Sequence, residues 1–139
     1  MNNTEFQTIV DGCKTNIDTV LGNKAREYSS KTDRLHNFQE AKKIMRCNTR
    51  EYALFGMLNK HLVSVVDIIL KYEKEGILPD ENILEEKVGD SINYLILLKA
   101  CFLEDIYNYE QEKKREQTSD DTLKGRIGEK LVTVVSPAP

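Results

Sequence analysis

The sequence contains little that would break a helix, because only three prolines and seven glycines occur in 139 residues. Proline interrupts helices and glycine weakens them, so this composition allows long helices. The cysteines Cys13, Cys47 and Cys101 are few and odd in number, and their spacing is not that of a metal site. We expect reduced, partly buried thiols, as is usual in a cytoplasmic protein.

Targeting and membrane-spanning signals are also missing. Residues 1–5 contain no basic region followed by an apolar segment, which a signal peptide would need. No uninterrupted apolar run reaches the ~20 residues that span a bilayer. The net charge of −3 provides no positive field to attract nucleic acid. A soluble protein is therefore expected, with neither a membrane nor nucleic acid as its partner.

The common catalytic motifs do not occur either. The chain has no Gly-x-Ser-x-Gly nucleophile, no phosphate-binding loop, no Cys-x-x-Cys and no His-Glu-x-x-His. If the protein is an enzyme, the chemistry left to it is metal-assisted attack of water on a phosphate.

What the sequence does contain is apolar residues at helical spacing, which predicts an all-α fold. Helices are expected at residues 4–28, 38–46, 50–75 and about 82–112. A capping box of Asn37 with Glu40 would start the second helix, Thr49 would cap the third, and Asp80 or Asn82 the fourth. The short connection between the two long helices predicts that they pack antiparallel in a bundle of about four helices.

The C-terminal part differs in composition from the rest. Residues 111–121 are charged and lack apolar side chains, which favours a fraying helix end and then a flexible segment. Residues 123–135 combine two glycines with β-prone residues, so a short strand, an arm onto a partner subunit and partial disorder stay open. The expected division is a helical domain over residues 1–112 and a linker with a tail over residues 113–139.

Each long helix carries a polar stripe on a largely apolar background. The stripes consist of Lys60, Ser64 and Asp67 on the third helix, and Glu86, Asp90 and Asn93 on the fourth. Within each stripe the spacing is i, i+4, i+7, which places the three side chains on one helix face. Antiparallel packing can bring the two stripes together. Hard oxygen ligands without sulfur suit Mg²⁺ or Mn²⁺.

The stripes and their neighbours supply the candidate site residues. Asp67, Glu86 and Asp90 are candidate ligands of the metal or of ribose hydroxyls. Candidate ligand-binding residues are Lys60 and Arg34 for phosphate, and Asn37, His61 and Asn93 for the base or sugar. The alternative is structural: the charges belong to solvated helix faces, and Tyr94 and Phe38 belong to the core.

The segment from Glu85 to Leu98 resembles a known family. Its Glu-Glu, Gly-Asp and Tyr-Leu elements are similar to those of MazG-like all-α nucleoside triphosphate pyrophosphohydrolases. This resemblance, over roughly residues 20–105, implies acids on an antiparallel helix pair that hold Mg²⁺, with the phosphates of a nucleotide bound to the metal. It also implies dimers or tetramers. The residues around Arg26, Arg34 and Asn37 are similar to those of small phage- and prophage-encoded helical domains.

The chain departs from the family pattern at the acids. Lys87 stands where the family has an acid, and Lys60, Ser64 and Asp67 replace its upstream acidic pair. Three hypotheses therefore stay open. They are a metal-dependent nucleoside triphosphate pyrophosphohydrolase, a protein that sequesters nucleotides without cleaving them, and a helical assembly protein without a small-molecule site.

Overall fold

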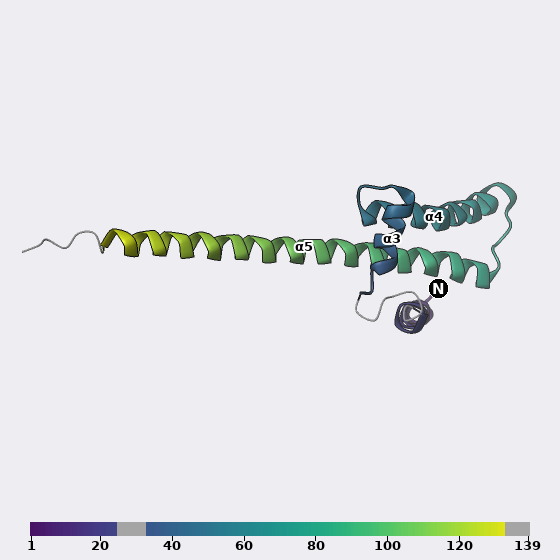
Figure 1. The fold of residues 1–139 in the computed structure, drawn as a ribbon. Coiled ribbons are helices and arrows are strands. Elements are labelled where there is room, and N and C mark those ends of the chain that lie inside the picture. The colour runs from purple at the N-terminus through teal and green to yellow at the C-terminus, as the bar shows by residue number, and fades with distance from the viewer. Residues whose placement is uncertain (25–32, 133–139) are drawn as a thin grey trace, which may run out of the picture. The chain divides into compact units, whose positions relative to one another are not determined.

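The computed structural model describes residues 1–24 and 33–132, and within these ranges all regular structure is helical (Figure 1). This confirms the all-α prediction. The elements are α1 (Asn3–Ile17), the π-helix η1 (Asp18–Lys24), α3 (His36–Met45), α4 (Arg50–Glu75) and α5 (Glu81–Val132). The chain divides into two units, Met1–Phe102 and Leu103–Pro139. The candidate site lies in the first unit.

The ends of the two long helices follow the capping residues predicted from the sequence. The Thr49 hydroxyl accepts a hydrogen bond from the Tyr52 N–H at 3.2 Å and caps α4. Gly76, with φ of 68°, ends α4 in the left-handed conformation that glycine adopts without strain. The Asp80 carboxylate accepts the N–H groups of Asn82 and Ile83 and so caps α5. Of the two candidates for that cap, Asp80 is therefore the residue used.

The predicted capping box at Asn37 and Glu40 is wrong. Helix α3 begins at His36, after Leu35, whose side chain cannot cap it. The chain turns earlier than expected because the Asp33 carboxylate accepts the Leu35 N–H at 2.8 Å. A capping box does occur at the start of α1, where the side chains of Asn2 and Glu5 each accept the other's backbone N–H.

Two further boundaries differ from the prediction. The first helix changes from α to π geometry after Ile17, and residues 25–28 of the predicted helix lie outside the described residues. Helix α5 runs to Val132, so the linker expected at residues 111–121 is helical, as are residues 123–132 of the expected tail. Glutamate, glutamine, lysine and arginine are common in this linker and favour helix without any apolar contact. Residues 133–139 lie outside the described residues.

Helices α4 and α5 run antiparallel and are joined by polar contacts about three turns apart. Arg50 Nη2 donates to the Cys101 carbonyl at 2.8 Å. His61 Nδ1 lies 3.2 Å from Asp90 Oδ2. His61 follows Arg50 by the same number of residues as Cys101 follows Asp90, about three turns in each helix. The predicted antiparallel pairing is thus confirmed.

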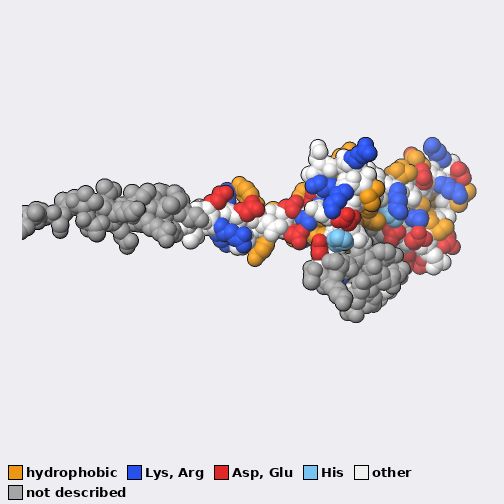
Figure 2. Space-filling model, viewed as in Figure 1, with side chains coloured by type: hydrophobic (Ala, Val, Ile, Leu, Met, Phe, Trp, Pro, Cys, Tyr) orange, Lys and Arg blue, Asp and Glu red, His pale blue; other side chains and the backbone are white. Residues whose placement is uncertain are grey.

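The buried core lies between these polar contacts and is small. Its central residues are Leu35, Leu54 and Cys101, with Phe38, Tyr94, Leu97, Leu98 and Ala100 packed against them. Helix α3 packs on α4, and Leu35 and Phe38 at its start join this core. Much of the remaining apolar surface is exposed, as at Val63, Val66 and Ile69 on α4. Figure 2 shows hydrophobic side chains lying among charged ones on one face.

Helix α4 is also apolar and long enough to cross a membrane, by length and composition alone. Its most apolar window has a mean hydropathy of 1.6. One such helix is weak evidence for a membrane span, and 22% of this window is buried in the described structure. Helix α4 also contacts α5 through Arg50 and His61.

Candidate functional site

A polar cluster lies near the middle of α4, centred on His61, where this helix meets α5. The imidazole is held on two sides by α5. Its Nδ1 lies 3.2 Å from Asp90 Oδ2. The centroids of the His61 and Tyr94 rings are 5.0 Å apart, and the two ring planes are tilted by 31°. The His61 side chain is 11% exposed and that of Asp90 is 36% exposed. The carboxylate therefore reaches solvent, whereas the histidine paired with it is almost covered.

Asn93 extends this cluster toward α1. It is 3% exposed, and its Nδ2 donates a long hydrogen bond of 3.5 Å to Oδ1 of Asn16. Gly89, one turn earlier on α5, leaves the room for this approach. A Cβ added to Gly89 would lie 3.3 Å from Asn16 Nδ2. The glycine thus lets α1 come close enough to place a second amide beside Asn93.

Two buried polar atoms of the cluster have no hydrogen-bond partner in the described part of the chain. They are His61 Nε2 and Asn93 Oδ1. An unpaired buried polar atom costs about 1–3 kcal/mol, and such atoms are uncommon in folded proteins. The asparagine oxygen accepts, and Nε2 of a neutral imidazole also accepts when its Nδ1–H donates to the Asp90 carboxylate. Both atoms are covered by protein, so a bound molecule could pair with them only where the side chains around them move aside.

The surroundings of the cluster shift the pKa values of Glu86, Lys87 and Tyr94. Lys87 Nζ lies 2.6 Å from Glu86 Oε1. The hydrogen bond from Lys87 lowers the pKa of the Glu86 carboxyl, and the same bond raises the pKa of the Lys87 ammonium. Burial, and then the charge of Asp90, raises the pKa of the Tyr94 phenol. At neutral pH the site thus combines a carboxylate, an ammonium and a neutral phenol.

Two of the residues predicted from the sequence, His61 and Asp90, pair directly, and Asn93 lies one turn beyond Asp90 on α5. Glu86 lies one turn before Asp90 on α5, but its side chain pairs with Lys87 and is 59% exposed. Of the polar stripe predicted on α5, Asp90 therefore meets α4, Asn93 meets α1 and Glu86 is exposed.

The polar stripe predicted on α4 does not face α5. Lys60 and Asp67 are exposed, and neither forms an ion pair with Glu86 or Asp90 in the described structure. The residues of α4 that are buried instead include Leu54, Leu58 and His61. His61 follows Lys60 directly, and one residue turns the side-chain direction by about 100° around a helix. The face that meets α5 is thus centred one residue further along than predicted.

Arg34 and Asn37, two further residues predicted to bind a ligand, lie around the start of α3. Arg34 is in the turn before this helix and Asn37 is in its first turn, and both are exposed. Within the described residues, neither forms a hydrogen bond with His61, Asp90 or Asn93. Their predicted role in binding a ligand would require a molecule long enough to reach from the cluster to α3.

The cluster does not form a complete metal site by itself. Over residues 1–24 and 33–132, no three His, Cys, Asp or Glu side chains gather closely enough to hold an ion. Mg²⁺ typically takes one or two carboxylates together with water and the phosphates of a ligand. Asp90 and Glu86 supply donors of that kind, so their chemistry fits an ion that arrives with a phosphorylated ligand.

Two residues of the site lie outside the set predicted from the sequence. Tyr94 is expected in the core; it does pack on the core cluster, and it also stacks on His61. Asn16 has no predicted role. The sequence pattern could have identified it. Residues 9, 13, 16 and 20 share one helix face, and Asn16 is the only amide among otherwise apolar side chains there.

No protein-family model, curated protein or solved structure matches this chain. The similarity to MazG-like proteins is thus carried by the residues of the Glu85–Leu98 segment and stays a prediction from the sequence.

Proposed function

We propose that this protein binds a nucleotide or a nucleotide-derived small molecule at the cluster of His61, Asp90 and Asn93. The observation that carries this proposal is the pair of buried atoms without partners in the described residues, His61 Nε2 and Asn93 Oδ1. A fold gains nothing from burying two polar groups unpaired. A ligand that pairs with both would remove this cost on binding.

Each residue has a proposed role that follows from its chemistry. His61 and Asn93 orient the base or sugar through directed hydrogen bonds. Asp90, which is partly exposed, binds ribose hydroxyls or an Mg²⁺ or Mn²⁺ ion that accompanies the phosphates, with Glu86 as the second carboxylate. Lys60 and Arg34 contact the phosphates through long, flexible side chains. The resemblance to phage-type MazG-like domains supports the nucleotide as the class of ligand and the cytoplasm as its location.

The proposal has an enzymatic and a non-enzymatic form. In the enzyme, a bound metal ion would supply Lewis-acid activation, while Asp90 would hold the ion and His61 would orient that carboxylate. In the sequestering form, the same groups hold the nucleotide without turnover. The Glu86–Lys87 pair favours the second form, because the ammonium occupies a carboxylate that the metal would need.

A thermal-shift panel tests binding directly. Nucleoside mono-, di- and triphosphates are added with and without Mg²⁺, and the melting temperature is measured. A ligand present at about one hundred times its Kd should stabilise the fold by about 2.7 kcal/mol. Asp90→Asn should abolish the shift. Asp67→Asn should leave the shift intact, because Asp67 is exposed and lies nearly two turns along α4 from His61. A panel with no shift would count against the proposal.

The same samples separate the two forms. Pyrophosphate release from a nucleoside triphosphate, dependent on Mg²⁺ and lost in Asp90→Ala, supports the pyrophosphohydrolase. Saturable binding without release supports sequestration.

An assembly role is the second candidate function, and the exposed apolar side chains of α4 and α5 favour it. Val63, Val66 and Ile69 would be covered in a homodimer or homotetramer. Light scattering at micromolar concentration should then report a multiple of 16.0 kDa. A monomeric mass would contradict assembly without affecting the nucleotide proposal.

A further inference from the structure

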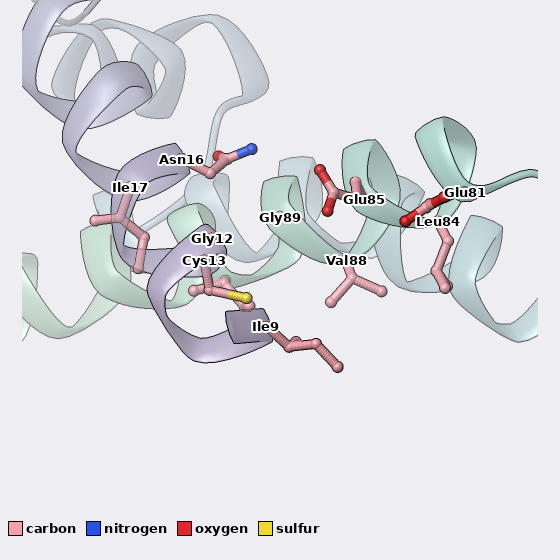
Figure 3. A pocket seen from close by; sticks show the side chains of 11 residues that line it. Ile9, Gly12, Cys13, Asn16, Ile17, Glu81, Leu84, Glu85, Val88 and Gly89 are labelled. Carbon is pink, nitrogen blue, oxygen red and sulfur yellow. The ribbon is translucent and has the colours of Figure 1, made fainter. Parts of the chain in front are cut away.

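A cavity of about 290 Å³ lies between α1 and the first turns of α5, beside the polar cluster but distinct from it (Figure 3). Its walls are mainly aliphatic, with Ile9 and Ile17 from α1 and Leu84, Val88 and Ile92 from α5. Cavities that bind small molecules are usually apolar with a few placed polar groups. This cavity has that composition, because Asn16, Glu81 and Glu85 are its polar residues.

Glycines on both helices keep this space open. Gly12 and Gly89 both line the cavity, and each sits inside a helix. A glycine in a helix interior costs about 1 kcal/mol relative to alanine. At Gly89 the close approach of Asn16 explains the glycine. At Gly12 a Cβ would meet nothing within 4 Å, so the packing of the protein gives no reason for glycine there. A larger side chain at Gly12 would instead occupy the cavity.

The charges select the kind of molecule. Glu81 and Glu85 both line the cavity, and none of the described residues that line it is basic, so nothing there would neutralise a phosphate. The two carboxylates and the Asn16 carbonyl oxygen accept hydrogen bonds and attract positive charge. Phosphate would therefore be repelled, whereas an amine or another N–H donor would be bound.

The volume limits the size. A volume of about 290 Å³ is at the lower end of the range of roughly 300–1,000 Å³ that small-molecule sites have, which suits a molecule of two or three rings. A helix from a second copy would need a longer groove, one that takes side chains at i, i+4 and i+7.

We propose that the cavity between α1 and α5 is a binding site for a small, mostly apolar molecule that carries an N–H donor or a positive charge and no phosphate. This site does not depend on nucleotide binding at His61, although Asn16 borders both. Occupancy would hold α1 against α5, because the ligand would replace the missing contact between their aliphatic faces.

A matched pair of fluorescent probes tests the chemistry. N-Phenyl-1-naphthylamine is apolar and has one N–H donor, and 8-anilino-1-naphthalenesulfonate has the same rings with an added anionic sulfonate. The amine should bind saturably with one site per chain. The sulfonate should bind at least about tenfold more weakly than the amine. In the double variant Glu81→Gln/Glu85→Gln, the difference in affinity between the two probes should become smaller. Equal affinity of both probes for the unmodified protein would overturn the assignment.

Substitutions at two glycines test the location. Gly12→Leu should fill the cavity and weaken binding of the amine by at least about tenfold. Gly22→Leu is the control, because a Cβ there also meets nothing within 4 Å but Gly22 does not line the cavity. Unchanged binding in Gly12→Leu would show that the probe sits on the exposed apolar faces, and the proposal would then be wrong.

Cys13 supplies a readout that needs no change to the cavity. Its half-buried thiol lines the cavity, whereas Cys47 lies outside it and Cys101 is fully buried. Bound amine should slow the reaction of Cys13 with a disulfide reagent in proportion to occupancy, and leave Cys47 unchanged. Equal slowing at both thiols, or none at Cys13, would contradict the site. A dimeric mass that becomes monomeric in Gly12→Leu would identify a second copy as the occupant and would also overturn the proposal.

Discussion

Asn93→Leu should make this protein more stable and remove its function. Asn93 is 3% exposed, and its Oδ1 has no hydrogen-bond partner in the described structure. Leucine has the same branching at Cγ and the same number of side-chain non-hydrogen atoms. The substitution therefore removes a buried polar group while it nearly preserves the shape.

The expected magnitude follows from opposing terms. Relief of the unpaired atom gains about 1–3 kcal/mol. Loss of the 3.5 Å bond to Asn16 removes little, because such a bond is long and weak. The larger methyl groups of leucine cost about 1 kcal/mol where the packing is tight. The net expectation is a rise of about 0–2 kcal/mol in the free energy of unfolding, or up to roughly 8 °C in Tm.

Urea unfolding followed by circular dichroism measures this change. Asn59→Leu is the matched control, because Asn59 is exposed on α4 and the exchange there reports only the helix propensity of leucine over asparagine. Asn93→Leu should exceed that control in stability and lose the nucleotide-dependent thermal shift, which Asn59→Leu keeps. A less stable Asn93→Leu would refute the reasoning and mark Asn93 as a structural residue.

Three other outcomes are expected. A double-mutant cycle on His61 and Asp90 should give a coupling of about 0.5–1.5 kcal/mol in urea unfolding, since the imidazole is covered but solvent partly screens the Asp90 carboxylate; a coupling near zero would remove Asp90 as the partner of the imidazole. Leu58→Ala should cost about 3 kcal/mol, because Leu58 is 1% exposed; a loss below about 1 kcal/mol would place it outside the core. The raised pKa of Tyr94 means that folding favours the neutral phenol. That contribution is fully present below the unfolded pKa of about 10 and is lost as pH rises through it toward the folded pKa. The wild type should therefore lose stability relative to Tyr94→Phe as pH rises above about 10, and parallel curves would contradict this.

The sequence is sufficient to predict a structural feature wherever neighbouring residues alone determine it, as at the ends of helices. Thr49 and Asp80 cap helices through their own side chains, and Gly76 ends one through its own backbone, so no distant contact is needed to predict them. The approach of Asp90 to α4 is predictable for a similar reason. Asp90 lies on the same helix face as Tyr94 and Leu97, which pack against the core.

The rotation of α4 cannot be predicted in the same way. This helix is apolar nearly all round, so its pattern favours no single face, and the choice between Lys60 and His61 is made by contact with α5. The course of the C-terminal part differs from the prediction for another reason. The absence of apolar residues at 111–121 argues against burial but not against helix, because helix propensity there is high.

The two polar contacts between α4 and α5 make the lengths of these helices interdependent. Arg50 meets Cys101 and His61 meets Asp90, with equal numbers of intervening residues on each helix. Removing one residue between Arg50 and His61 would turn the rest of α4 by about 100° and break one contact. Removing four residues, about one turn, between the contacts on both helices would instead shorten them equally and keep both pairs of side chains facing each other. Paired four-residue deletions should thus be tolerated better than either deletion alone.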